Sequence, residues 1–255
     1  MIDLHCHILC GIDDGAQTIE DSLHMAKQAV SEGIHTIVAT PHHQNGQYIN
    51  EKKEIVQRVA KLNTYFLKER IPLTILPGQE SRIYGEIIKD YHNGKILTLN
   101  QTNKYLFIEL PPSQVPKFTG ELVYDIQSEG LIPIIVHPER NSRLMEDPDI
   151  LYNLVNKGVL TQITASSLTG RFGKKVKKFS MDLIEANLTH MIASDAHNLS
   201  GRNFYMQEAS EWVASKYGID MLYMFHENAE AVIKGYACFQ ETPQQVKKKK
   251  FLGIF

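Results

Sequence analysis

Residues 1–43 read MIDLHCHILCGIDDGAQTIEDSLHMAKQAVSEGIHTIVATPHH and contain a complete strand–helix–strand unit. The apolar residues 1–4 predict a first strand, and residues 36–39 predict a second. Between them, a T-x-x-D pattern begins at Thr18 and a glycine stands at Gly33, as is typical of the two ends of a helix over residues 19–32. Two strands joined by a helix predict parallel pairing.

The same alternation continues along the chain. Further strands are predicted at residues 73–76, 105–110, 132–136, 160–164 and 191–193. Further helices are predicted at residues 51–69, 118–129, 148–157, 174–186 and 203–216. The pattern predicts an α/β fold with parallel strands, one strand short of a (β/α)₈ barrel. An open doubly wound sheet would give the same alternation, so periodicity alone leaves both arrangements open.

The composition is that of an ordinary globular protein. Of 255 residues, 43% are hydrophobic and 22% are charged, and the formal net charge is −2. This acidic balance disfavours a nucleic-acid partner, which usually requires a basic surface. Three cysteines are too few for a disulfide framework and indicate a reducing compartment. No apolar run approaches the roughly 20 residues that span a bilayer, and we expect a cytoplasmic protein without a cleaved leader or a stable membrane insertion.

We expect residues 1–239 to form a single catalytic domain, because no shift in composition marks a boundary within them. Residues 240–255 differ. They contain Pro243, three glutamines and the run KKKK at residues 247–250 before an apolar end. We interpret this segment as a basic, flexible tail, although contact with anionic lipid or a partner is an alternative.

Histidine, aspartate or glutamate, whose side chains can bind metal, follows six of the seven predicted strands. In parallel α/β folds the carboxyl ends of the strands meet at one edge, where active sites lie. A single histidine at a strand end is usually a packing or surface residue, but six such strand ends together predict a multinuclear metal site. The residues concerned are His5 and His7, His42, Glu80, Glu109, His137, and Asp195 with His197.

The local spacing supports this interpretation. Because strand side chains alternate between faces, His5 and His7 point the same way. Asp13 and Asp14 lie in a turn that can fold back over the same edge, and either could be a ligand. Imidazole and carboxylate without thiolate suit Mn²⁺, Zn²⁺ or Fe. His43 remains ambiguous, since it could support a ligand instead of being one.

These motifs resemble the polymerase-and-histidinol-phosphatase (PHP) family of metal-dependent phosphoesterases. The resemblance covers nearly the whole chain. It rests on H-x-H at residues 5–7, T-P-H at 40–42, G-x-E at 78–80, H-P-E-R at 137–140 and S-D-A-H-N at 194–198. Within the family, the motifs are similar to the bacterial metal-dependent protein-tyrosine phosphatases of capsule and exopolysaccharide operons, the YwqE/CpsB type.

The resemblance implies a distorted TIM-like (β/α)₇ barrel with the metal site at the carboxyl ends of the strands, and up to three ions. Mn²⁺ is the expected metal, with Fe, Zn, Co or Mg as alternatives. Carried over by position, the first ion takes His5, His7, Glu80 and Asp195; the second takes Glu80, Glu109 and His137; and the third takes Asp14, His42 and His197. Family members often have histidine where this chain has Asp14 and Glu109, and additional carboxylates favour a harder ion.

A phosphate substrate also needs cationic donors. Arg140 and Arg202 lie three and five residues after His137 and His197, so both are candidates for binding phosphate oxygens. His42 or Asp195 is the candidate for relaying a proton to the leaving oxygen. Cysteine-based chemistry is excluded, because it needs an arginine six residues after the cysteine and no cysteine here has one.

The expected substrate is phosphotyrosine on proteins, such as a bacterial tyrosine kinase and other proteins of capsule synthesis. The loops at residues 44–50 and 111–117 lack the aliphatic residues of a closed lid, which predicts a shallow, open site. Tyr48, Phe118 and Phe172 are candidates for contact with a tyrosine ring. The alternatives are a small phosphomonoester such as histidinol phosphate, and a kinase-docking regulator with a vestigial metal site.

Overall fold

The structure is a computed structural model that describes residues 1–247. Its strands form two sheets in which every neighbouring pair is parallel. The first sheet has the order β1-β2-β4, with β1 at Ile2–Cys6, β2 at Thr36–Ala39 and β4 at Thr74–Pro77. The second has the order β3-β5-β6-β7-β8-β9, with strands at His42–His43, Glu80–Arg82, Tyr105–Glu109, Ile132–Val136, Leu160–Thr164 and Met191–Ala193.

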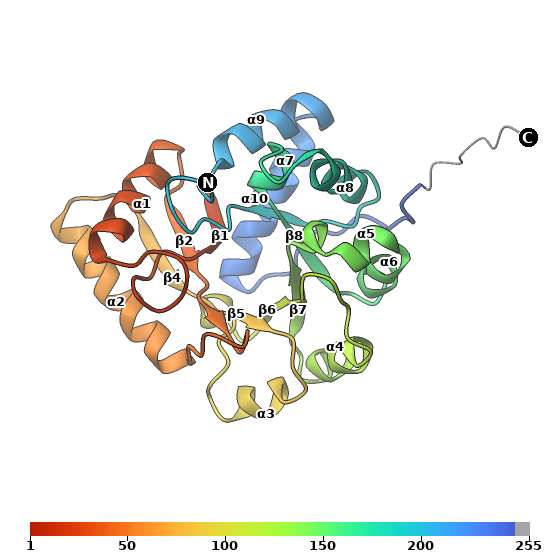
Figure 1. Cartoon of the computed structure of the whole chain (residues 1–255), viewed down its shortest axis with the longest axis horizontal. Coiled ribbons are helices and arrows are strands. Elements are labelled where there is room, and N and C mark those ends of the chain that lie inside the picture. Colours follow the sequence, from red (N-terminus) through yellow and green to blue (C-terminus); the bar gives the residue numbers. More distant parts are fainter. Residues whose placement is uncertain (248–255) are drawn as a thin grey trace, which may run out of the picture.

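Helices surround the strands on the outside of the molecule (Figure 1). The longer ones are α1 (Ile19–Ser31), α2 (Lys52–Lys68), α4 (Thr119–Ser128), α8 (Lys174–Glu185), α9 (Met206–Tyr217) and α10 (Ile219–Lys234). The shorter ones are α3 (Ile87–His92), α5 (Ser142–Glu146), α6 (Asp149–Val155) and α7 (Ala165–Leu168), with 3₁₀ turns η1 (Leu99–Gln101) and η2 (Pro138–Arg140). The predicted α/β alternation with parallel strands is confirmed.

Two of the predicted strands continue, after a short break, into the second sheet. Strand β2 is followed by Thr40-Pro41 and then β3, and β4 is followed by Gly78-Gln79 and then β5. Gly78 is required at this point, because a Cβ there would lie 2.6 Å from Cγ1 of Val38. The break places His42 beside Glu80 in the register of β3 and β5.

The first strand also meets the last. Cys6 and Ala196 form an isolated parallel bridge. The amide of His7 donates to the carbonyl of Ala196 at 2.9 Å, and the amide of Asp195 donates to the carbonyl of His5 at 2.8 Å. These bonds bring the N-terminal H-x-H motif against the S-D-A-H motif almost 190 residues later.

The buried apolar residues form two clusters. The larger fills the space between the strands and the helices. The smaller gathers strand residues such as Leu4, Phe107 and Val136 and is joined by Ala229 and Val232 of α10. The core therefore anchors every strand whose carboxyl end carries a candidate site residue.

The end of the described chain contacts α8 and its C-terminus. The amide of Gln244 donates to the carbonyl of Ala186 at 2.8 Å, and the carbonyl of Thr242 accepts from Nδ2 of Asn187 at 3.0 Å. Residues 248–255, which make up half of the predicted basic tail, lie outside the described residues. Within residues 1–247 there is no helix with the length and apolarity needed to cross a membrane.

Candidate metal centre

Four buried side chains from three strands form the centre of the site. Nε2 of His5 lies 3.3 Å from Oδ1 of Asp195 and 3.4 Å from Oε2 of Glu80. Nε2 of His7 lies 3.3 Å from each of the same two oxygens. The four donor atoms therefore enclose one small space, and they are the four that the resemblance assigns to a first ion.

Glu80 extends this arrangement toward the next strands. Its Oε1 lies 2.8 Å from Nε2 of His137, and its Oε2 lies 2.8 Å from Nδ1 of His42. The same nitrogen of His42 is 3.7 Å from Oε2 of Glu109. Glu80 thus stands between the first group of donors and a second group that contains Glu109 and His137, as a bridging carboxylate would.

A third group lies at the outer side of the first. Oδ1 of Asp14 is 3.3 Å from Nε2 of His42 and 3.4 Å from Nε2 of His197. Together with His7, these residues offer donor atoms that all lie within 4.8 Å of one another. All the predicted metal-ligand residues are therefore brought together at one edge.

Asp13 and Asp14 differ in what each carboxylate faces. Oδ2 of Asp13 is 2.7 Å from Nδ1 of His7, on the side of that ring away from Glu80 and Asp195. Gln162 on β8 makes the equivalent contact to Nδ1 of His5, at 2.9 Å. Such contacts fix the tautomer and direction of a ligating histidine. Asp13 and Gln162 therefore orient donors, while Asp14 presents one.

The donors fit metal ions because several of them are buried without a hydrogen-bond partner. Unpartnered polar atoms buried in a protein are costly and call for a partner such as an ion. A set of imidazoles and carboxylates without thiolate matches ions that prefer nitrogen and oxygen. The unpartnered atoms of the site are Nδ1 of His42, Oε2 of Glu80, Oε2 of Glu109, Oδ1 of Asp195 and Nε2 of His197.

Three arginines flank the cluster. Nη1 of Arg140 lies 2.7 Å and Nη2 of Arg202 lies 3.0 Å from the same oxygen, Oδ2 of Asp195. Arg202 also reaches Oδ2 of Asp14 at 3.4 Å. The third, Arg82, pairs with Oε1 of Glu109 at 3.1 Å. Arg82 was not among the residues predicted from the sequence, although its position two residues after Glu80 on a strand places both on one face.

The backbone is strained at two of these residues. His137 has a φ of 35° and Asp195 a φ of 53°, in the left-handed region that side chains other than glycine rarely adopt. Asp195 is held there by its neighbour Ser194, whose amide and hydroxyl donate to the buried carboxylate of Asp3 at 2.9 and 2.5 Å. Strain of this kind concentrates at functional sites.

The charges of the site also shift its proton affinities. Burial, and then the positive charge of Arg140, lower the pKa of His137 to about 3, so this ring is neutral at pH 7, as a ligand must be. Burial and the nearby Glu80 raise the pKa of Glu109 to about 7. Burial disfavours the charged form of His42, but Glu80 and Asp14 outweigh it and raise its pKa to about 9. His42 would therefore release a proton when it binds an ion.

The three candidate aromatic residues have different surroundings. The ring of Tyr48 stacks over His42 at 6.3 Å between centroids. The ring of Phe172 lies under the guanidinium of Arg140 at 5.4 Å. Phe118 is 39% exposed. His43, which the sequence left ambiguous, is buried and lies 6.4 Å from the ring of Tyr84, outside the groups of donor atoms.

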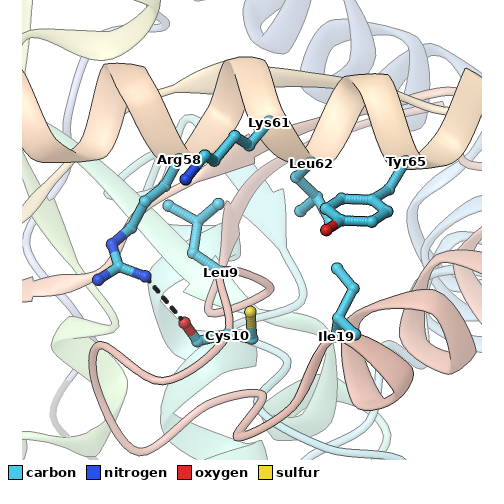
Figure 2. Close-up of a pocket in the computed structure, with 7 residues that line it drawn as sticks. All are labelled: Leu9, Cys10, Ile19, Arg58, Lys61, Leu62 and Tyr65. Atoms are coloured by element: carbon cyan, nitrogen blue, oxygen red, sulfur yellow. Dashed lines mark hydrogen bonds between the residues drawn. The ribbon is translucent and has the colours of Figure 1, made fainter.

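The cysteines are unpaired and take no part in the centre. Burial raises the pKa of the Cys6 thiol well above its usual value, and its sulfur donates to the carbonyl of Ala196 at 3.5 Å. Cys10 points into a separate cavity of about 210 Å³ between α2 and the loop after β1 (Figure 2). That cavity is lined by Leu9, Cys10, Ile19, Arg58, Lys61, Leu62 and Tyr65, none of which is a donor of the metal centre.

The fold and the site together define a class: parallel α/β proteins that hold histidines, carboxylates and arginines at the carboxyl edge of their strands. A family model described as capsular polysaccharide synthesis, CpsB/CapC, matches residues 1–234. The chain belongs to this family.

Two relatives match over the whole of both chains. Tyrosine-protein phosphatase YwqE of Bacillus subtilis is 50% identical over 255 residues, which is 100% of each chain. A putative tyrosine-protein phosphatase CapC of Staphylococcus aureus is 38% identical, again over 100% of each. A structure from a study of YwqE from B. subtilis and CpsB from Streptococcus pneumoniae, described as unique metal-dependent tyrosine phosphatases, superposes with a TM-score of 0.95. It is 50% identical and covers 97% of this chain and 100% of its own.

Proposed function

We propose that this chain is a metal-dependent protein-tyrosine phosphatase, a phosphoric monoester hydrolase that works without a cysteine nucleophile. The proposal rests on the cluster of buried donor atoms around Glu80 and Asp195 that have no hydrogen-bond partner. It rests also on the two guanidinium groups that contact Oδ2 of Asp195. The relatives named tyrosine phosphatases, identical at half of all positions in one case, support the same activity.

Each of the three groups of donors is proposed to hold one ion. Support comes from the distances of 2.8–3.7 Å between their facing atoms. Mn²⁺ suits the abundance of carboxylate oxygens, and Fe, Zn, Co and Mg are the alternatives. The first ion takes His5, His7, Glu80 and Asp195; the second takes Glu80, Glu109 and His137; and the third takes Asp14, His42 and His197.

When bound, such ions lower the pKa of a bound water and stabilise charge on the attacking and leaving oxygens. The side chains around them bind the phosphate and transfer the proton. Arg140 and Arg202 converge on one point beside Asp195, where their planar donors bind and orient the phosphate oxygens. His42 or Asp195 is the group proposed to relay a proton to the leaving oxygen. A phenol, with a pKa near 10, needs this help less than an alkyl alcohol does.

The proposed substrates are tyrosine-phosphorylated proteins, above all a bacterial tyrosine kinase and other proteins of capsule or exopolysaccharide synthesis. The family description supports this context. The partly exposed Asp14 and Arg202, at 46% and 31% side-chain exposure, support a site open to a flexible segment of a protein. The three unpaired cysteines support a cytoplasmic location.

The proposed architecture behind this site is one domain in which the two sheets form a distorted seven-stranded barrel. In that arrangement β2 with β3, and β4 with β5, each count as one strand position. Support comes from the bridge between Cys6 and Ala196 on one side and from the bond between the amide of Gly78 and the carbonyl of Ala39 on the other.

The test is a comparison of two substrates with protein that has been stripped by a chelator and reloaded with Mn²⁺. A phosphotyrosine peptide with polar flanks and histidinol phosphate are assayed at equal concentration. We expect the peptide to turn over with the higher kcat/KM and all turnover to stop on chelation. A higher kcat/KM for histidinol phosphate would replace this proposal with the small-metabolite alternative. Binding of a phosphoprotein by the loaded protein without turnover would replace it with the docking regulator.

A further inference from the structure

A small cavity of about 130 Å³ opens beside the second group of donors. It lies between the loop that follows β6 and the turn η2 that follows β7. Its polar lining consists of two candidate ligands, Glu109 and His137, together with Arg140 and Asn141. The remaining lining is apolar and consists of Leu110, Pro112, Val136 and Pro138.

We propose that this cavity receives the phenol ring of the substrate's phosphotyrosine. The inference rests on the proposed phosphatase function and specifies where that function gains its preference for aromatic esters. None of the aromatic residues named from the sequence, Tyr48, Phe118 or Phe172, lines it.

The size and the lining of the cavity suit one aromatic ring. A cavity of about 150 Å³ lined by aliphatic side chains is enough to bind benzene. The cavity here is of similar volume, and its lining combines four apolar residues with charged and polar ones. A phenol has the same division, with an apolar ring and one polar oxygen.

The cavity shares Arg140 with the place where phosphate is proposed to bind. Arg140 lines it and also reaches Oδ2 of Asp195 at 2.7 Å, beside Arg202. A ring in the cavity therefore has its ester oxygen toward Glu109 and His137, with the phosphate within reach of Arg140. None of the other four cavities described here has Arg140 in its lining.

The wall of the cavity is fixed in place before any ligand binds. Nδ2 of Asn141 donates to the carbonyl of Pro111 at 2.7 Å and to that of Gln114 at 2.9 Å. The amide of Ser142 donates to the carbonyl of Pro112 at 2.9 Å. These bonds hold the loop after β6 against the start of α5. A preformed wall gives affinity because little entropy is lost when the ring binds.

A larger hollow of about 370 Å³ adjoins the third group of donors, and its chemistry is less suitable. It includes Asp14, Asp21, Gln17 and His24 among its lining, so a ring there would face carboxylates and other polar groups. Leu199, which is 42% exposed, also lines it. This leucine provides a matched control for Leu110.

The test measures binding to Mn²⁺-loaded protein by calorimetry with phenylphosphonate and methylphosphonate. The two probes carry the same charged group, so the ratio of their Kd values isolates the ring. We expect phenylphosphonate to bind about tenfold more tightly in the parent protein, since burying several ring carbons stabilises the complex by more than 1 kcal/mol. Leu110→Ala should lower this ratio about fivefold and leave the Kd of methylphosphonate unchanged.

Leu199→Ala, the matched control, should leave the ratio within about twofold of the parent value. Because Leu110 is buried and its loss could disturb folding, Pro112→Ala at the exposed rim is the second variant, with an expected decrease of about twofold. Two results would overturn the inference, provided that the phosphonates still bind. One is a ratio of Kd values near one in the parent protein. The other is a ratio that falls in Leu199→Ala but not in Leu110→Ala or Pro112→Ala. If neither phosphonate binds the loaded protein, the proposed function itself fails.

Discussion

The two oxygens of the Asp195 carboxylate have different neighbours, and each serves a different part of the site. Oδ1 faces the imidazoles of His5 and His7 and has no hydrogen-bond partner, whereas Oδ2 receives both Arg140 and Arg202. One oxygen is therefore free for an ion, and the other marks the point where phosphate oxygens would meet the arginines. The left-handed backbone of Asp195 lets both oxygens take these positions at once.

Replacement of one of these arginines tests the phosphate-binding role directly. Arg202→Ala should lower kcat/KM for a phosphotyrosine peptide about 100-fold without loss of bound metal, because removing one donor to transition-state charge typically costs that much. Steady-state kinetics and elemental analysis of the same preparation provide the two measurements.

Arg143→Ala is the matched control, since Arg143 is also partly exposed and pairs only within α5 and its C-cap, with Asp147. Its kcat/KM should remain close to the parent value. A nearly normal kcat/KM in Arg202→Ala would remove Arg202 from the phosphate site.

At the level of residues, the sequence predicted the donors because their chemistry and their places at strand ends are visible in it. It could not predict the residues that orient them. Gln162 lies on β8, the one predicted strand without a metal-binding type of side chain at its end, and only the three-dimensional structure places it against His5. Likewise, the neighbours Asp13 and Asp14 have the same chemistry, and only the fold of their turn separates their roles.

At the scale of elements, seven of the nine strands and five of the six longer helices could be predicted because each has an apolar pattern of sufficient length. Strands β3 and β5 were missed because two or three residues carry no periodicity. Helix α10 was missed although Leu222, Phe225, Ala229 and Val232 repeat at helical spacing, because no strand follows it among the described residues to continue the alternation. The junctions between elements depend on tertiary contacts and were therefore beyond prediction.

One such junction positions two residues of the site. Glu139 lies between His137 and Arg140 in the turn η2 and is fully buried. Its Oε1 accepts from the amide and hydroxyl of Thr164, at 2.9 and 3.0 Å, and from the hydroxyl of Ser167 at 2.7 Å. A single carboxylate thus ties the turn after β7 to the start of α7.

Glu139→Ala should lower the free energy of unfolding by about 2–4 kcal/mol, because three buried donors lose their acceptor. It should also lower kcat/KM through displacement of Arg140. Glu139→Gln keeps an acceptor, and burial raises the pKa of Glu139, which makes a neutral group tolerable at this position. Urea unfolding of both variants checks this, and equal stability of the two would show that the hydrogen bonds do not matter.

At the scale of the whole molecule, the fold brings distant motifs to one edge and closes a buried core beneath them. His190 lies in this core, where Nδ1 accepts from the amide of Thr161 at 3.1 Å and Nε2 has no hydrogen-bond partner among the described residues. Burial lowers the pKa of His190 to about 4. The unfolded chain, with a histidine pKa near 6.5, binds a proton that the folded chain does not.

The stability contributed by keeping His190 neutral is therefore present above about pH 6.5 and is lost as the pH falls toward 4, by about 2–3 kcal/mol. His190→Gln, which cannot titrate, should lose less stability over the same interval. Denaturant unfolding of the metal-free proteins at pH 7 and pH 4.5 gives the comparison, since protonation of the other histidines is common to both. The same loss in the two proteins would contradict the argument.

One edge of the fold is proposed to hold metal ions that are required for hydrolysis of phosphotyrosine. Glu80 is the residue to change, because its two oxygens lie 2.8–3.4 Å from nitrogens of His5, His7, His42 and His137. Glu86→Ala, on an exposed glutamate paired with Lys89, is the control.

The measurement is elemental analysis of Glu80→Ala together with its kcat/KM for a phosphotyrosine peptide, after exposure to Mn²⁺ and removal of free metal. We predict that metal content and activity fall together in Glu80→Ala, while Glu86→Ala retains both. A Glu80→Ala protein that is inactive with its full complement of metal, or active without metal, would contradict it.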